Sequence, residues 1–215
     1  MTDAPLTPSE ALDLLLAGNQ RFISGTPQHP HQDAARRAET APGQRPFAVL
    51  FGCSDSRLAA EIIFDRGLGD LFVVRTAGHV VGPEVLGSIE YGASMLDCPL
   101  VVVLGHDSCG AVAATRAALT DGVVATGYVR DLIERVTPSV LSARATGLTQ
   151  DDDIIAEHIR HTVALLLDRS RVLADQVTTG QTAVVGLSYQ LADGGARVVT
   201  ARGLPMEAAA PNPAP

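Results

Sequence analysis

Four short apolar runs, rich in Val and Leu, constrain the fold of this chain more than any other feature of its sequence. Their hydrophobicity is continuous rather than alternating, in PFAVLFG (46–52), DLFVVRTAG (70–78), PLVVVLGH (99–106) and QTAVVGLSY (181–189). A strand with this pattern is buried on both faces, as in a parallel sheet that helices cover. The runs therefore predict an α/β fold with a mostly parallel central sheet of four to five strands.

Helical patterns alternate with these runs, as expected for an α/β domain. They cover roughly 57–66, 83–96, 109–120, 126–146 and 151–177. After Tyr189, the segment LADGGARVVT predicts a turn and a short edge strand. We therefore expect a single α/β domain over residues 46–204, with helices flanking the sheet.

The segments outside this domain have a different character. Thr7, Pro8 and Glu10 form a capping box that predicts an N-terminal helix ending near Gly25. Residues 26–45 are rich in Pro, Gln, His and Arg and predict an extended arm. So long an arm is unusual within a compact domain, so we expect residues 1–45 to pack on a partner subunit. The tail, residues 205–215, has no pattern and is expected to be disordered.

Composition narrows the possible function classes. The sequence contains no Lys, which excludes Schiff-base chemistry and a P-loop lysine. Its net charge of −8 argues against nucleic-acid and anionic-membrane partners, since both need clustered positive charge. No run reaches about 18 apolar residues, so we expect no membrane span. The N-terminus lacks a signal-peptide pattern, so we expect a cytoplasmic protein whose three cysteines are thiols or metal ligands.

Chemically distinctive side chains follow the first and third apolar runs. Cys53 comes directly after the first run, and His106 and Cys109 lie three residues apart at the end of the third. The carboxyl ends of parallel strands meet at one edge of a sheet, so these three side chains can face one ion. Two thiolates and an imidazole are the three-ligand set of a catalytic zinc site. Water at the vacant fourth position would lose its proton readily and become a nucleophilic hydroxide.

Asp55 and Arg57 lie in the same CSDSR segment as Cys53, so they are expected close to that fourth position. Asp55 is placed to orient the water or to occupy the position itself. Arg57 is placed to hold the carboxylate in a bidentate pair and keep it off the metal. Each residue alone has a plainer interpretation: a buried core cysteine, an accidental HxxC or a surface ion pair. Their conjunction favours a metal site.

Structural roles suit the remaining cysteine and histidines better. Cys98 stands at the start of the third run, the wrong end of the sheet for a ligand. His79 follows the second run and is a candidate proton shuttle, but a structural role is preferred. Exposed or structural roles are also expected for the histidines of the arm and of the last long helix, His29, His31, His158 and His161.

Several motifs in the chain resemble those of the bacterial β-class carbonic anhydrases. They are NQRF (19–22), CSDSR (53–57), RTAG (75–78), SIEYG (88–92), GHDSCG (105–110) and VVGLSYQLADG (184–194). The resemblance implies that one Zn²⁺ per subunit binds to Cys53, His106 and Cys109. It implies that Asp55 and Arg57 form a dyad that gates the fourth zinc position. The implied activity is reversible hydration of CO₂ to bicarbonate and a proton, through zinc-bound hydroxide, in a homodimer or a dimer of dimers.

The same resemblance implies a substrate pocket. In plant-type members, a glutamine at the position of Gln44 hydrogen-bonds the substrate across the dimer interface. Phe72, Ala77 and Tyr91 match the apolar wall beside the zinc, and Gly110 is the last implied pocket residue. An apolar wall suits CO₂, which carries no charge for a protein to bind.

Two positions depart from the family pattern. Thr76 stands where many members have Asn, which puts any hydrogen bond from that amide in doubt. Leu50 stands where some bacterial members carry a Trp that lines a non-catalytic bicarbonate pocket. The chain has no Trp, so that form of allosteric inhibition is not expected.

Alternatives to CO₂ hydration stay open at this point. One is a hydrolase of carbon disulfide or carbonyl sulfide on the same zinc site, which the resemblance admits. Another is a non-catalytic zinc protein or thiol redox switch, in which Asp55 fills the fourth position permanently. Arg57 argues against that one, because a permanent ligand needs no competitor. The dyad also predicts a pH switch, with activity falling as pH falls.

Overall fold

A five-stranded sheet organises the protein, and the computed structural model describes residues 6–123 and 125–204. The strands are β1 (Ala48–Cys53), β2 (Leu71–Thr76), β3 (Leu100–His106), β4 (Ala183–Tyr189) and β5 (Ala196–Arg202). Their spatial order is β2-β1-β3-β4-β5; the first four are parallel and β5 runs antiparallel to β4. The predicted α/β fold and the predicted edge strand are both confirmed. The predicted tail, 205–215, lies outside the described residues.

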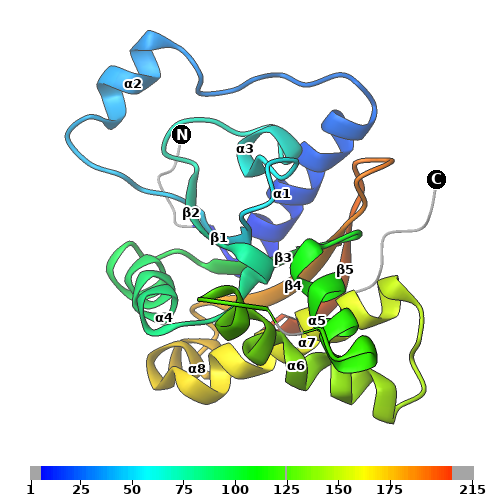
Figure 1. Cartoon of the computed structure of the whole chain (residues 1–215). Helices are drawn as coiled ribbons and strands as arrows, with labels where there is room; N and C mark the ends of the chain where they lie inside the picture. The colour runs from blue at the N-terminus through cyan, green and yellow to red at the C-terminus, as the bar shows by residue number, and fades with distance from the viewer. Residues whose placement is uncertain (1–5, 124, 205–215) are drawn as a thin grey trace.

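Helices cover both faces of this sheet (Figure 1). Helix α1 packs on β3 and on α3, above the sheet in this view, whereas α7 packs on β3, β4 and β5 below it. The helical elements are α1 (Pro8–Ile23), α2 (Ala34–Thr40), α3 (Ala60–Ile63), η1 (Ala77–His79), α4 (Pro83–Glu90), η2 (Tyr91–Met95), α5 (Gly110–Asp121), α6 (Val129–Ala145), α7 (Asp151–Arg169) and α8 (Arg171–Thr178). None of the helices in the described part of the chain is long and apolar enough to cross a membrane.

Two predicted helices differ from the observed ones. The segment 57–66 forms only the single turn α3, which begins after Ala59 in an extended conformation and ends before Asp65, whose φ is +44°. The segment 151–177 is two helices, α7 and α8, which meet at Ser170 in an extended conformation. The Ser170 hydroxyl donates to Glu90 at 2.6 Å and accepts from the N–H of Leu173 at 3.0 Å, so it caps α8 and fixes the break.

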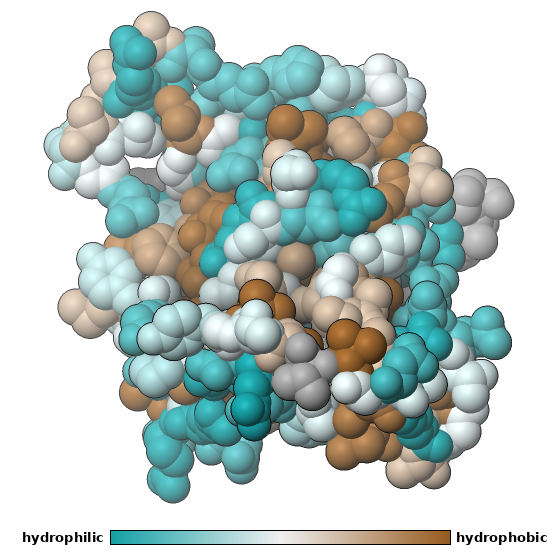
Figure 2. All heavy atoms as spheres, in the orientation of Figure 1, coloured by the Kyte–Doolittle hydropathy of each residue, from teal (hydrophilic) through white to brown (hydrophobic). Residues whose placement is uncertain are grey.

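The predicted extended arm contains one helix. Asp33 caps α2 by accepting from the N–H of Arg36, and no residue of α2 is buried. The arm is attached to the body at two buried carboxylates: Asp65 accepts from the N–H groups of Gln28 and His29, and Asp70 pairs with His31. Its outer part stands away from the body (Figure 2). An arm without a buried face of its own is consistent with the predicted packing on a partner, which stays a prediction.

The two edges of the sheet differ from its centre in burial. Strands β1 and β3 are buried along their whole length, whereas most of β2 is half-buried although it carries Phe72, Val73 and Val74. Apolar side chains gather beside β2, at the left of the view in Figure 2. Tyr91 and Met95, in η2, add exposed apolar surface, 47% and 68% exposed respectively. An apolar edge strand with no neighbouring strand in the described chain is typical of an interface.

Candidate metal centre

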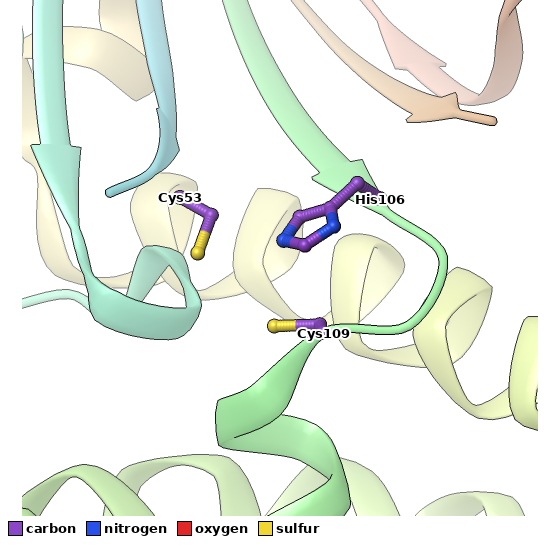
Figure 3. A group of neighbouring side chains, drawn as sticks. All are labelled: Cys53, His106 and Cys109. Carbon is purple, nitrogen blue, oxygen red and sulfur yellow. The ribbon is translucent and has the colours of Figure 1, made fainter. Parts of the chain in front are cut away.

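The carboxyl ends of two neighbouring strands bring the predicted ligands together. Cys53 is the last residue of β1, His106 is the last of β3, and Cys109 is the N-cap of α5. One donor atom from each of the three residues lies within 4.8 Å of the other two, and all three residues are buried. Figure 3 shows the two thiols and the imidazole turned toward a common point. Among the described residues, this is the group that could hold a metal ion.

The tautomer of His106 follows from its hydrogen bond. Its Nδ1 lies 2.7 Å from the carbonyl oxygen of Asp107, and because a carbonyl only accepts, Nδ1 carries the proton. Nε2 therefore holds a lone pair, and this buried atom has no hydrogen-bond partner within the described residues. A buried polar atom without a partner costs about 1–3 kcal/mol, so its retention here points to a ligand. A neutral imidazole with two thiols fits Zn²⁺, which takes this donor set in four-coordinate sites.

The two thiols behave as a coupled pair. A hydrogen bond from Cys109 lowers the pKa of Cys53, assisted by the backbone N–H groups of Asp55 and Gly78, against the opposing effect of burial. The hydrogen bond to Cys53, together with burial, raises the pKa of Cys109. A hydrogen bond between the two sulfurs needs a proton on one of them. A divalent cation would displace that proton and stabilise both sulfurs as thiolates.

Asp55 and Arg57 form a close bidentate pair beside this group. The guanidinium donates to Asp55 Oδ1 from Nε at 2.9 Å and to Oδ2 from Nη2 at 2.7 Å, and the Arg57 N–H donates to Oδ1 at 3.0 Å. These bonds hold the pKa of the Asp55 carboxyl well below its usual range. Asp55 Oδ2 also lies 4.0 Å from His106 Nε2. The carboxylate is therefore ionised, held by Arg57 and adjacent to the ligand cluster.

The Arg75 guanidinium and the Gly78 N–H hold the Cys53 segment in place, a role that the sequence alone does not reveal. Arg75, at the end of β2, donates to the carbonyl oxygens of Cys53 at 2.9 Å and Asp55 at 2.6 Å. The N–H of Gly78 donates to Cys53 Sγ at 3.2 Å. The RTAG motif contains both residues, but nothing local in the sequence says that they reach back to β1.

The predicted pocket residues divide into two groups. Ala77 opens η1, directly after β2, and Gly110 opens α5, directly after Cys109, so both lie at the metal edge of the sheet. Phe72 is near the amino end of β2, opposite Val49, and packs on Tyr91 with ring centroids 6.0 Å apart.

Gln44 is exposed and precedes β1 by four residues, on the side away from Cys53. A six-residue strand is roughly 17–20 Å long, so Gln44, Phe72 and Tyr91 lie at the edge opposite the metal ligands of their own chain.

The residues expected to be structural, and the two that depart from the family pattern, are buried or bonded elsewhere. Cys98 is buried and donates to the carbonyl of Pro46, and burial raises its pKa to about 12. Thr76, at the position where the resemblance implies Asn in many members, donates its hydroxyl hydrogen to Val80 O at 2.9 Å. Leu50 is a buried core residue. His158 is also buried, so of its two expected roles the structural one applies.

Comparisons with known proteins agree with this geometry. A family model described as carbonic anhydrase matches residues 48–196. Carbonic anhydrase 2 of Mycobacterium tuberculosis is 56% identical over 187 residues, which cover 87% of this chain and 90% of that protein. The carbonic anhydrase of Mycolicibacterium smegmatis is also 56% identical over 187 residues, covering 87% of this chain and 91% of that one.

Solved structures share the fold. The β-carbonic anhydrase CafA of Aspergillus fumigatus superposes with a TM-score of 0.66 at 26% identity, covering 92% of this chain and 94% of that one. A chain from the structures of two tetrameric β-carbonic anhydrases of Sordaria macrospora superposes with a TM-score of 0.67 at 22% identity. The match covers 87% of this chain and 95% of that one. With the family match, the identity to the mycobacterial enzymes and the Cys-His-Cys cluster, the chain belongs to the β-class carbonic anhydrases, which are zinc enzymes.

Proposed function

We propose that the protein catalyses the reversible hydration of CO₂ to bicarbonate and a proton at the Cys53–His106–Cys109 cluster. The observation that carries the proposal is a buried His106 Nε2 without a hydrogen-bond partner in the described chain, facing two buried thiols, beside an ionised Asp55. Zn²⁺ held by the three residues would supply a Lewis acid that lowers the pKa of water at its open position. The two thiols must stay reduced to serve as ligands, which suits the cytoplasm.

The chain's own residues orient the reacting water and leave an approach for the substrate. The Asp55 carboxylate, 4.0 Å from His106 Nε2, can accept a hydrogen bond from the reacting water and orient it toward CO₂. Arg57 keeps that carboxylate in place through its bidentate pair. Ala77 and Gly110 offer an apolar approach that suits an uncharged substrate. The proton that the reaction releases is transferred to buffer.

A second copy of the chain would complete the site. Gln44, Phe72 and Tyr91 lie too far from the ligands of their own subunit, and the apolar edge at β2 supports pairing. A homodimer in which Gln44 of each subunit hydrogen-bonds substrate in the other's site accounts for both features. The arm, residues 26–45, would lie on the partner, and a dimer of dimers would repeat this unit.

The Asp55–Arg57 pair would also gate the site. The Asp55 carboxylate stays ionised over the physiological pH range, since Arg57 depresses its pKa. With zinc held by the cluster, this carboxylate would be the group of the chain that competes with a weakly bound, protonated water for the metal, and Arg57 would hold it back. Activity is therefore expected to fall as pH falls, and a profile flat from mildly acidic to alkaline pH would contradict the gate.

The two cysteines at opposite edges of the sheet allow a matched test. Zinc content and stopped-flow CO₂ hydration should be measured for the wild type, Cys53→Ser and Cys98→Ser. We expect Cys53→Ser to lose zinc and activity, and Cys98→Ser to keep both, because the Cys98 thiol bonds to Pro46 O, away from the cluster. Carbon disulfide and carbonyl sulfide should be tried as substrates of the same samples. A zinc-loaded wild type that hydrolyses them but leaves CO₂ unchanged, or that is inert toward all three, would contradict the proposal.

A further inference from the structure

Gly78 contacts one cysteine ligand directly and the start of the helix that follows the other. Its N–H donates to Cys53 Sγ at 3.2 Å, and its α-carbon is so close to α5 that a Cβ there would lie 2.6 Å from Ala111 Cβ. Ala111 is two residues after Cys109. Gly78 has φ +65°, a left-handed conformation that glycine adopts without strain. The position of this one residue therefore affects both thiols.

His158, far away in sequence on α7, holds the other side of Gly78. Its Nε2 lies 2.9 Å from the carbonyl oxygen of Gly78, and since a carbonyl only accepts, Nε2 carries the proton. Nδ1 lies 2.8 Å from Ser139 Oγ and so accepts from that hydroxyl. Burial is the main cause of a His158 pKa lowered to about 4, so the ring is neutral near pH 7 and this tautomer is stable.

His79 fixes the ring of His158 from one face. The two imidazoles lie with centroids 4.3 Å apart and planes 34° apart, and both ring nitrogens of His79 are buried without a partner in the described chain. His79 itself has φ +41°, which a non-glycine residue adopts at a cost. Backbone strain and unpaired nitrogens next to a metal cluster indicate a segment held in place for function.

We propose that His158 is a positioning residue for the Cys53 thiolate, acting through Gly78. The bonds at Gly78 N–H and Gly78 C=O lie on either side of one α-carbon, so together they fix both backbone dihedrals of this residue. A fixed N–H donor at Cys53 Sγ withdraws electron density from the thiolate and orients it toward the metal. This is the kind of outer contact that tunes metal affinity and Lewis acidity. The proposal rests on the proposed function only for its catalytic consequence, since zinc binding alone can test it.

The matched variants are His158→Met and His158→Gln. The two side chains have similar length and flexibility, but only glutamine has an N–H that can donate to Gly78 O. His161→Met, one turn further along α7, is the control for removing a histidine from this helix. Two readouts are needed: zinc affinity by competition with a chelator, and the thiolate-to-cobalt charge-transfer band of the cobalt(II)-substituted protein. Neither readout depends on CO₂ turnover.

We expect His158→Met to weaken zinc binding 10–100-fold, because the Cys53 thiolate is no longer held in its orientation toward the metal. The charge-transfer band should move to lower energy, because the thiolate becomes richer in electrons. His158→Gln should recover most of both changes, and His161→Met should resemble the wild type. If His158→Met fails to fold, Ser139→Ala should give the same changes in smaller degree, because it removes only the donor to Nδ1.

The proposal would be overturned if His158→Met bound zinc with wild-type affinity and its charge-transfer band did not shift. If Ser139→Ala is used in its place, the same result there would overturn it. Equal losses in His158→Met and His158→Gln would also overturn it. A protein that binds zinc as predicted but does not hydrate CO₂ would refute the proposed function and leave this inference standing.

Discussion

Replacing Gly78 by alanine tests whether the close contact between η1 and α5 positions the cluster. Two costs follow from the structure. An L-residue at φ +65° loses about 1–2 kcal/mol relative to glycine. The new Cβ would also lie 2.6 Å from Ala111 Cβ, and overpacking of this kind costs about 1–3 kcal/mol. We therefore expect Gly78→Ala to lower the free energy of unfolding by about 2–5 kcal/mol in total.

Gly122 provides the matched control. It ends α5 with φ +67°, nearly the same as Gly78, but a Cβ added there would meet no heavy atom within 4 Å among the described residues. Gly122→Ala should therefore show only the conformational cost, about 1–2 kcal/mol. The difference between the two variants isolates the steric contact, and Ala111→Gly in the Gly78→Ala background should recover part of it.

The assay is urea unfolding of zinc-loaded protein at one fixed subunit concentration, with zinc affinity measured in parallel. A contact that moves the start of α5 should also displace Cys109, so Gly78→Ala should bind zinc more weakly and Gly122→Ala should not. The reasoning fails if Gly78→Ala is no more destabilising than Gly122→Ala, or if its zinc affinity equals that of the wild type.

The same geometry leads to three other predictions. Arg57→Ala should raise the pH below which CO₂ hydration is lost, because it frees the ionised Asp55; an unchanged pH profile would contradict the gate. Inactive Gln44→Ala and Cys53→Ser subunits, co-expressed with different tags, should form active mixed dimers with one intact site, whereas Gln44 acting in its own subunit would leave them inactive. His158 has a folded pKa of about 4 against 6.5 unfolded, so its stabilising contribution is complete above pH 6.5 and is lost as pH falls toward 4. In unfolding experiments, His158→Gln should flatten that fall, by at most about 3 kcal/mol; an identical pH dependence would rule this out.

The strands and the three ligands were predictable because their signals are local. A continuous apolar run such as LVVVLGH identifies a strand buried on both faces, and in a parallel sheet every such strand ends at the same edge. That rule is enough to bring Cys53 and His106 together. The same rule excludes Cys98 as a ligand, because Cys98 precedes β3 and therefore lies at the opposite edge of the sheet.

The features that sequence reasoning missed depend on contacts between distant segments. The break between α7 and α8 is made by Ser170 and Glu90, which are 80 residues apart. The bond from His158 to Gly78 also spans 80 residues, and no periodicity in α7 distinguishes His158 from an ordinary buried position. The short α3 ends before Asp65, which has φ +44° and whose carboxylate accepts from Arg21 and from the N–H groups of Gln28 and His29, about 40 residues earlier in the chain.

The separation of Gln44, Phe72 and Tyr91 from Ala77 and Gly110 also required the fold. Phe72 and Ala77 are five residues apart in sequence, yet β2 places them at opposite edges of the sheet. Motif matching assigns all five residues to one pocket and does not say from which subunit each comes.

Restoration of activity by zinc tests the central claim most directly. The protein should be stripped with a chelator and titrated with Zn²⁺ while CO₂ hydration is followed by stopped flow at alkaline pH. We predict an inactive stripped protein whose activity rises linearly and stops at one equivalent per subunit, with Cys98→Ser behaving alike and Cys53→Ser staying inactive. Stripped protein that keeps full activity, or one equivalent of bound zinc without CO₂ hydration, would contradict the assignment.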